Sequence, residues 1–73
     1  MYVNFNDELV REYIAIKVKG MNHYLWFKTA NTKRENGRFF GTGGWGKSGA
    51  LTHIECDTCE ITSIIYSDSP QYN

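Results

Sequence analysis

The residues best suited to phosphate chemistry lie in a glycine cluster. Residues 41–48 read Gly-Thr-Gly-Gly-Trp-Gly-Lys-Ser, which fits the phosphate-loop pattern G-x-x-x-x-G-K-[ST]. A helix must follow such a loop, but residues 50–54 read Ala-Leu-Thr-His-Ile and favour a strand. We therefore reject a nucleotide hydrolase. We interpret residues 41–49 either as an adaptable loop presenting Trp45 and Lys47, or as a hairpin connection in which Trp45 covers the core.

The sulfur and imidazole groups suit metal binding only weakly. Cys56-Asp57-Thr58-Cys59 is a single C-x-x-C, and His53 stands three residues before it. Structural zinc needs four ligands, and strand alternation places His53 on the face opposite both cysteines. We predict no metal and no cofactor. Two buried thiols are the default expectation, although the spacing allows a disulfide across a turn.

Acid–base groups are present, but the chain is too short to enclose them. His53, Glu55 and Glu60 share one face in the expected strands, which suits proton transfer or a hard cation. Catalysis also requires a concave pocket that excludes water, and 73 residues in a small sheet leave little volume for one. We predict that the protein is not an enzyme.

Aromatic and basic residues form a more promising binding surface. Seven of them are our candidates for contacting a partner or ligand: Tyr24, Trp26, Lys28, Arg34, Arg38, Trp45 and Lys47. Aromatic rings beside cations suit nucleic acids, because rings stack on bases and cations hold phosphates. The same residue types are common in protein interfaces. The alternative is that the N-terminal segment or a second subunit covers this face.

Charge varies along the chain although the total is zero. Residues 1–16 carry −2, residues 17–47 carry +6 and residues 48–73 carry −4. The basic middle could be an anion site. The alternative is that the acidic last strands lie beside the basic ones and neutralise them.

Three hairpins organise the expected strands. A two-residue turn at Gly20-Met21 pairs Ile14 with Phe27 and Ile16 with Leu25, all facing the core, and turns Trp26 outward. Asn36-Gly37 is a strong hairpin signal that places Glu35 opposite Arg38 and begins a strand over 38–42. Asp57-Thr58 closes a third hairpin, which pairs Cys56 with Cys59 and opposes two glutamates that need a basic neighbour.

The ends of the chain are less regular. Asn6 or Asp7 caps a short helix over 7–12 with Leu9 and Val10 turned inward, while residues 2–5 favour a strand equally well. Residues 67–73 have the composition of a frayed tail. The chain is therefore expected to be one domain, residues 1–73, of all-β class or β-rich with one helical turn. Its architecture is a five-stranded antiparallel twisted sheet or half-open barrel.

Composition limits the function to a small number of classes. No run of about 18 apolar residues is present, and residues 1–20 do not have the pattern of a signal peptide, so we expect a cytoplasmic location without membrane contact. So small a core favours homo-oligomerisation. By analogy with small phage-encoded inhibitors of host systems, we predict a non-enzymatic binding protein that blocks or sequesters a protein partner. A small β module that binds nucleic acid or a nucleotide is the alternative.

Overall fold

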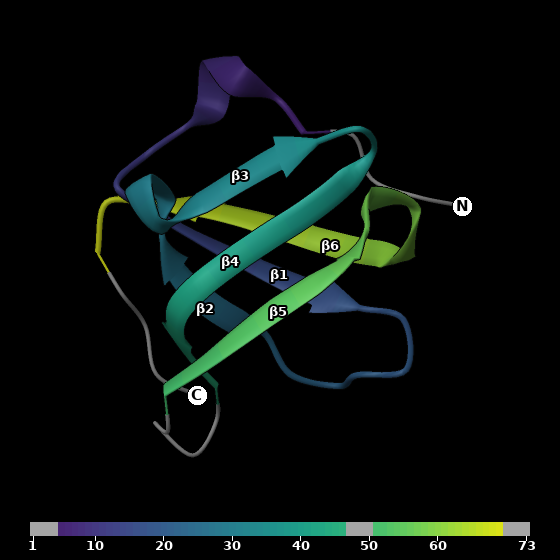
Figure 1. Ribbon diagram of the computed structural model, residues 1–73. Helices are drawn as coiled ribbons and strands as arrows, with labels where there is room; N and C mark the ends of the chain where they lie inside the picture. The colour runs from purple at the N-terminus through teal and green to yellow at the C-terminus, as the bar shows by residue number, and fades with distance from the viewer. Residues whose placement is uncertain (1–4, 47–50, 70–73) are drawn as a thin grey trace.

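The computed structural model describes residues 5–46 and 51–69. These residues form six β-strands and three short 3₁₀ helices, with no α-helix (Figure 1). The strands are β1 (Tyr13–Val18), β2 (Leu25–Lys28), β3 (Thr32–Glu35), β4 (Arg38–Trp45), β5 (Leu51–Asp57) and β6 (Ile61–Ser67). The 3₁₀ helices are η1 (Asp7–Leu9), η2 (Thr29–Asn31) and η3 (Thr58–Glu60). The predicted all-β class is confirmed.

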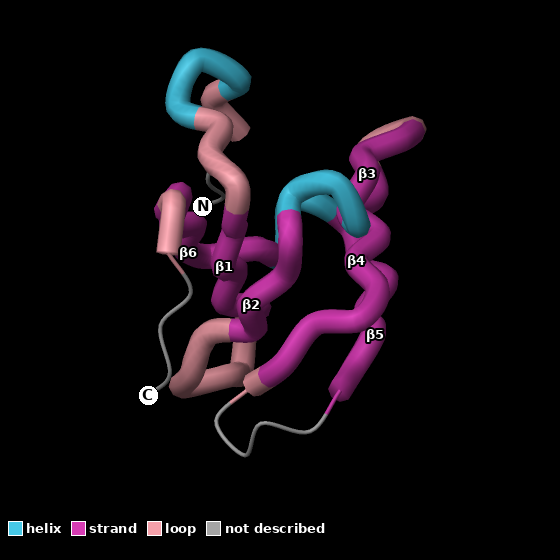
Figure 2. Tube along the Cα trace, turned by 90° about the vertical axis from the view of Figure 1, so that its left-hand side faces the viewer, coloured by secondary structure: helices cyan, strands magenta, loops and turns pink. Residues whose placement is uncertain are grey.

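The strands form one antiparallel sheet that curls into a half-open barrel. β1 lies between β2 and β6, while β4 pairs with β3, β2 and β5. Residues 38–41 pair with β3 on one edge of β4 and with β5 on the other, and Trp45 pairs with both β2 and β5. β3 and β2 therefore follow one another along the same edge of β4. Figure 2 shows β1, β2 and β6 on one side of the molecule and β3, β4 and β5 on the other.

The expected register of the first hairpin is confirmed, although its turn is wrong. Ile14 pairs with Phe27 and Ile16 with Leu25. The chain does not turn at Gly20-Met21. Instead, the Met21 N–H donates to the Val18 carbonyl, so Lys19 and Gly20 are the central turn residues. Gly20 has a φ of 91° at the third turn position, where a type II turn needs a positive value.

The Asn36-Gly37 hairpin is confirmed. Both residues have positive φ, 54° and 76°, and Glu35 pairs with Arg38. These values match a two-residue turn with both central residues left-handed, which suits the twist of the flanking strands. The strand that follows is longer than expected, because it continues through the glycine cluster to Trp45.

The third expected hairpin is wrong. β5 pairs with β4 and places Cys56 opposite Phe39, while β6 crosses to β1 and places Ile61 opposite Val18. The turn at 58–60 is a 3₁₀ helix that redirects the chain between the two sides of the barrel. This arrangement separates Glu55 from Glu60 and buries Ile61 completely in the core.

The core lies inside the curl of the sheet. Its buried members are Ile14, Ile16, Leu25, Phe27, Phe39, Cys56 and Ile61. Glycines in β4 let the strand approach this core closely. A Cβ built on Gly41 would lie 2.8 Å from Cε2 of Phe27. Residues 41–45 are thus a packed strand rather than the adaptable loop or hairpin connection that was expected, and residues 47–49 lie outside the described residues.

Residues 5–10 form a strap over the open side of the barrel (Figure 1). The Asn6 side chain caps η1 by accepting a hydrogen bond from the Glu8 N–H, as expected. The helix is only three residues long, and Leu9 and Val10 are 46% and 43% exposed, so the prediction that they turn inward is wrong. Residues 2–4 and 70–73 lie outside the described residues, and β6 extends to Ser67.

Candidate protein-binding surface

Trp26 is not on the protein surface. Its side of the sheet is opposite Phe27, as the register predicts, but the residue is only 2% exposed. Trp26 pairs across the strands with Trp45, and Trp45 meets Tyr13 edge to face with ring centroids 6.1 Å apart. We name these three residues the outer aromatic cluster. The expectation that Trp26 contacts a partner is therefore wrong, because β4 brings a second tryptophan onto the same face.

Tyr24 and Lys28 remain accessible near this cluster. The Tyr24 hydroxyl and the Ser63 hydroxyl are hydrogen-bonded at 2.6 Å, and Lys17 Nζ lies 4.7 Å from the Tyr24 ring centroid. Lys28 is exposed at the end of β2. Of the predicted aromatic contact residues on the first hairpin, Tyr24 is thus half-buried at the margin of the outer aromatic cluster. Lys47 lies outside the described residues.

Both predicted arginines are held in ion pairs. Arg38 contacts Asp57 at 2.6 Å and Glu55 at 3.2 Å. Desolvation alone would lower the pKa of Arg38, but Asp57 and then Glu55 raise it by more in total, so the net shift is upward. Arg34 pairs with Asp7 and lies 4.3 Å from the Phe5 ring centroid. The acidic segments therefore neutralise these two basic residues, which is the second of the two interpretations of the charge pattern.

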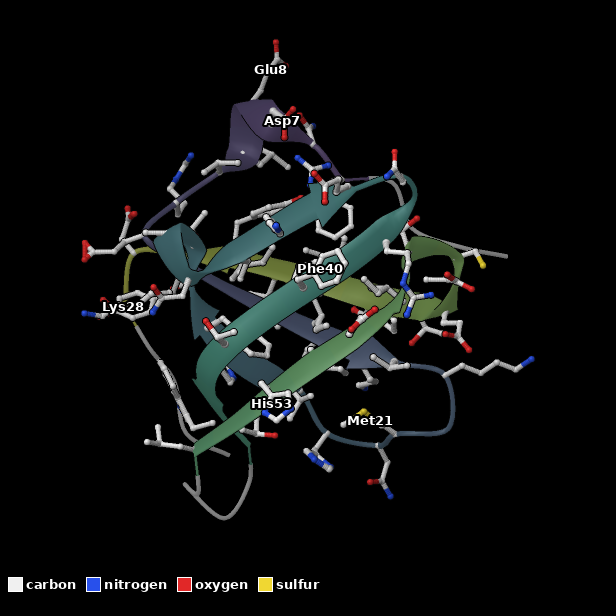
Figure 3. The ribbon with its side chains drawn as sticks, viewed as in Figure 1. Asp7, Glu8, Met21, Lys28, Phe40 and His53 are labelled. Atoms are coloured by element: carbon white, nitrogen blue, oxygen red, sulfur yellow. The ribbon has the colours of Figure 1, made fainter. Side chains whose placement is uncertain are left out.

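The arrangement of β3, β4 and β5 exposes a different surface, which we name the outer β3–β5 face. It comprises Lys33, Glu35, Arg38, Phe40, Thr42, Leu51, His53, Glu55 and Asp57. Phe40 is half-buried at its centre and faces outward from β4 in Figure 3, where His53 lies lower on β5. Lys33 Nζ is 5.4 Å from the Phe40 ring centroid. An aromatic ring is thus presented among charges of both signs.

A shallow hollow adjoins Phe40. It measures about 370 Å³ and is lined by Ala30, Asn31, Thr32, Lys33, Phe40 and Thr42. Phe40 was not among the predicted site residues. The signal for it was present, because the Asn36-Gly37 register places residues 33, 35, 38 and 40 on one face, and Phe39-Phe40 must then have one ring inside and one outside.

A second cavity lies beneath the strap. It measures about 360 Å³, and its apolar lining includes Phe5, Phe39 and Tyr66. Phe5 stacks on Phe39 with centroids 5.7 Å apart, and the Asn6 N–H donates to the Tyr66 hydroxyl at 2.9 Å. The strap is therefore fastened to both sides of the barrel. The cavity is the space between the strap and the barrel.

The two cysteines differ in environment, and both are free. Cys56 is buried against the core while Cys59 is exposed, so the default expectation of two buried thiols holds only for Cys56. Burial and then the charge of Glu60 raise the pKa of Cys56. Within residues 5–46 and 51–69, no three His, Cys, Asp or Glu side chains gather as a ligand set for a metal.

Comparisons with protein families, curated proteins and solved structures find no match for this chain. In the described part of the chain, no helix has the length and apolarity needed to cross a membrane.

Proposed function

We propose that this is a non-enzymatic binding protein that captures a protein partner on its outer β3–β5 face. The observation that carries the proposal is Phe40, an aromatic ring left half-exposed in the middle of a three-stranded face beside a hollow of about 370 Å³. Aromatic anchors at the centre of a patch supply much of the binding energy in protein interfaces, while a polar rim supplies specificity.

The charges on this face favour a protein over a nucleic acid. This face has two basic side chains, Lys33 and Arg38, and three carboxylates, those of Glu35, Glu55 and Asp57. Arg38 already contacts two of these carboxylates. A phosphate backbone needs a surplus of positive charge. A mixed surface of this kind is better matched by a protein that carries both signs.

The composition of the hollow beside Phe40 supports a role in binding. Lys33 is the one ionisable side chain in its lining, which includes no histidine, cysteine or carboxylate to serve as general base or nucleophile. Both cysteines are free thiols, which is typical of a reducing compartment. We therefore propose a cytoplasmic protein that blocks or sequesters its target, in the manner of small phage-encoded inhibitors.

Site-specific photo-crosslinking tests the proposal. The photoreactive residue p-benzoylphenylalanine replaces Phe40 in cells that normally make the protein, and the matched control replaces Leu9, which is 46% exposed on the strap. We expect one discrete protein adduct from position 40 that is absent from position 9. The same adducts from both positions, or none from position 40, would overturn the proposal.

A second measurement addresses the alternative. Fluorescence anisotropy of a labelled 20-nucleotide single-stranded DNA is recorded at low and at high salt. We expect no saturable binding. Binding that weakens steeply with salt, because phosphate counterions are released, would favour the nucleic-acid module instead.

A further inference from the structure

β5 has one paired edge and one open edge. Within the described residues it pairs with β4 alone, and Figure 1 shows it as the last strand on its side of the barrel. The Thr58 N–H donates to the Gly37 carbonyl, which fixes the alternation of the β4–β5 ladder. Residues 52, 54 and 56 therefore direct their backbone groups toward β4, while residues 51, 53, 55 and 57 direct theirs outward.

The features that usually protect an edge strand are scarce here. β5 is seven residues long and contains no proline and no lysine. The β-bulge at residues 42–43 lies in β4, so the alternation on β5 is uninterrupted. Leu51, at the start of the strand, is 81% exposed. Such an edge is a template for another strand, because within the described residues its outward N–H and C=O groups have no backbone partner; only the His53 carbonyl accepts a side-chain hydrogen bond, a long one of 3.4 Å from the Thr52 hydroxyl.

We infer that the open edge of β5 pairs antiparallel with β5 of a second copy of this chain, with the two-fold axis at Ile54. This axis overlaps all seven residues of both strands. It places His53 opposite Glu55 of the second copy, and Glu55 opposite that copy's His53. Shifting the axis to residue 53 opposes two histidines, and shifting it to residue 55 opposes two glutamates, which repel. The self-complementary register is thus also the one with the longest overlap.

The acidic end of β5 is partly compensated within each chain. Glu55 and Asp57 both contact Arg38 of their own chain, and its single positive charge offsets one of their two negative charges. Asp57 then lies opposite Leu51 of the second copy, and its carboxylate stays paired with Arg38 on β4. The result is one continuous sheet in which the outer β3–β5 faces of both copies are side by side.

This arrangement extends the proposed function without depending on it. Two Phe40 rings on one surface make the dimer bivalent, so a target with two sites, or a two-fold target, binds more tightly than one monomer would allow. The dimer also exists without any target. The two inferences can therefore fail separately.

Sedimentation velocity over about 1 μM to 1 mM protein tests the dimer. We expect wild type to shift from monomer to dimer within this range. His53→Glu places a glutamate opposite Glu55 of the second copy and is expected to remain monomeric throughout. His53→Lys places a cation opposite Glu55 of the second copy and is expected to dimerise, as is the exposed loop control Asn22→Glu. A monomeric wild type, or dimerisation unaffected by His53→Glu, would overturn the inference.

His53→Pro separates the edge from the fold. The N–H of residue 53 points away from β4, so proline removes an interchain donor and leaves the β4–β5 ladder intact. We expect a monomer whose urea midpoint matches that of monomeric His53→Glu. Should His53→Pro dimerise like wild type, the β5 edge is not the interface.

Disulfide trapping tests the register. In a Cys59→Ser background, Ile54→Cys places two thiols at the axis, where directly opposite Cα atoms are about 4.5 Å apart. We expect mild oxidation to give a covalent dimer from Ile54→Cys in higher yield than from His53→Cys. The reverse order, or equal yields, would overturn the register, whereas the photo-crosslinking result at Phe40 would still decide the proposed function.

Discussion

The ring of Phe27 fills the space that a side chain would need at Gly44. A Cβ on Gly44 would meet this ring and would also lie 2.5 Å from the Trp26 carbonyl oxygen. β4 can cross β2 only because glycine stands at this position. Gly41 and Gly44 are therefore packing residues, because a side chain at either position would collide with the Phe27 ring.

Gly44→Ala should destabilise the fold. Forcing a methyl group against Phe27 and backbone requires a shift of strand or ring, and overpacking of this kind costs about 1–3 kcal/mol. Urea unfolding followed by tryptophan fluorescence measures the loss. Thr42→Ser, an exposed change in the same strand that keeps the hydroxyl donating to the Asn31 carbonyl, should stay within about 0.5 kcal/mol of wild type. A wild-type midpoint for Gly44→Ala would contradict the close approach.

The sequence predicts local pairing well in this chain and non-local pairing poorly. The registers around Ile14–Phe27 and Glu35–Arg38 follow from alternation and turn chemistry within about fifteen residues. β6 pairs with β1 across the length of the chain, and no neighbouring turn signals that contact. Asp57-Thr58 suggested a hairpin instead, because adjacency in sequence was the only available guide.

In the candidate site, too, the sequence predicts local features and misses contacts between distant strands. Periodicity placed Trp26 and Phe27 on opposite faces, and it could not show that Trp45 would arrive from β4 to cover Trp26. Arg38 was correctly placed at the start of a strand, but its carboxylates come from β5, which the sequence had paired elsewhere. Residues 41–49 were predicted as a loop from their glycine content. Composition alone does not distinguish a flexible loop from a strand whose glycines make room for a bulky ring.

Trp26→Ala should destabilise the fold about as much as Phe27→Ala. Both side chains are at most 2% exposed, and deleting a buried aromatic side chain costs about 3–5 kcal/mol. Trp26→Phe should cost less than Trp26→Ala, because most of the ring volume remains and the Nε1 donor, which has no hydrogen-bond partner in the described part of the chain, is removed. Urea midpoints rank the three variants.

Phe40→Ala is the matched control for those variants. Its ring is half-exposed on the outer β3–β5 face, so the loss in unfolding free energy should be smaller than for either buried ring. If Phe40→Ala destabilises as much as Phe27→Ala, Phe40 is a core residue and cannot anchor a partner.

Phe5→Ala should loosen the strap. Phe5 stacks on Phe39, and the Arg34 guanidinium lies over the Phe5 ring. Removing the Phe5 side chain therefore takes away an aromatic pair and a cation–π contact. We expect a loss of about 1–3 kcal/mol in unfolding free energy. Amide hydrogen exchange at Leu9, whose N–H donates to the Asn6 carbonyl, should become faster. Leu9→Ala, at an exposed position, should change the unfolding free energy by less than about 0.5 kcal/mol.

The two thiols should react at very different rates. Cys59 is exposed, whereas Cys56 is buried opposite Phe39 with a raised pKa, so it has little thiolate and little access to reagent. With the thiol reagent DTNB at pH 8, we expect one fast equivalent and one that is slower by on the order of tenfold or more. Cys59→Ser should abolish the fast phase. Two fast equivalents in wild type would contradict the burial of Cys56.

The raised pKa of Cys56 also sets the direction of an alkaline effect on stability. Below the ordinary thiol pKa of 9.0, the folded and unfolded states both hold the proton, and the group contributes nothing. As the pH rises beyond that value, the unfolded thiol ionises first while the folded thiol keeps its proton, so the unfolded state is favoured. Urea midpoints at pH 8 and pH 10 should therefore fall further for wild type than for Cys56→Ala, in which the group is absent. An equal fall in both proteins would show that Cys56 ionises as easily in the folded state as in the unfolded one.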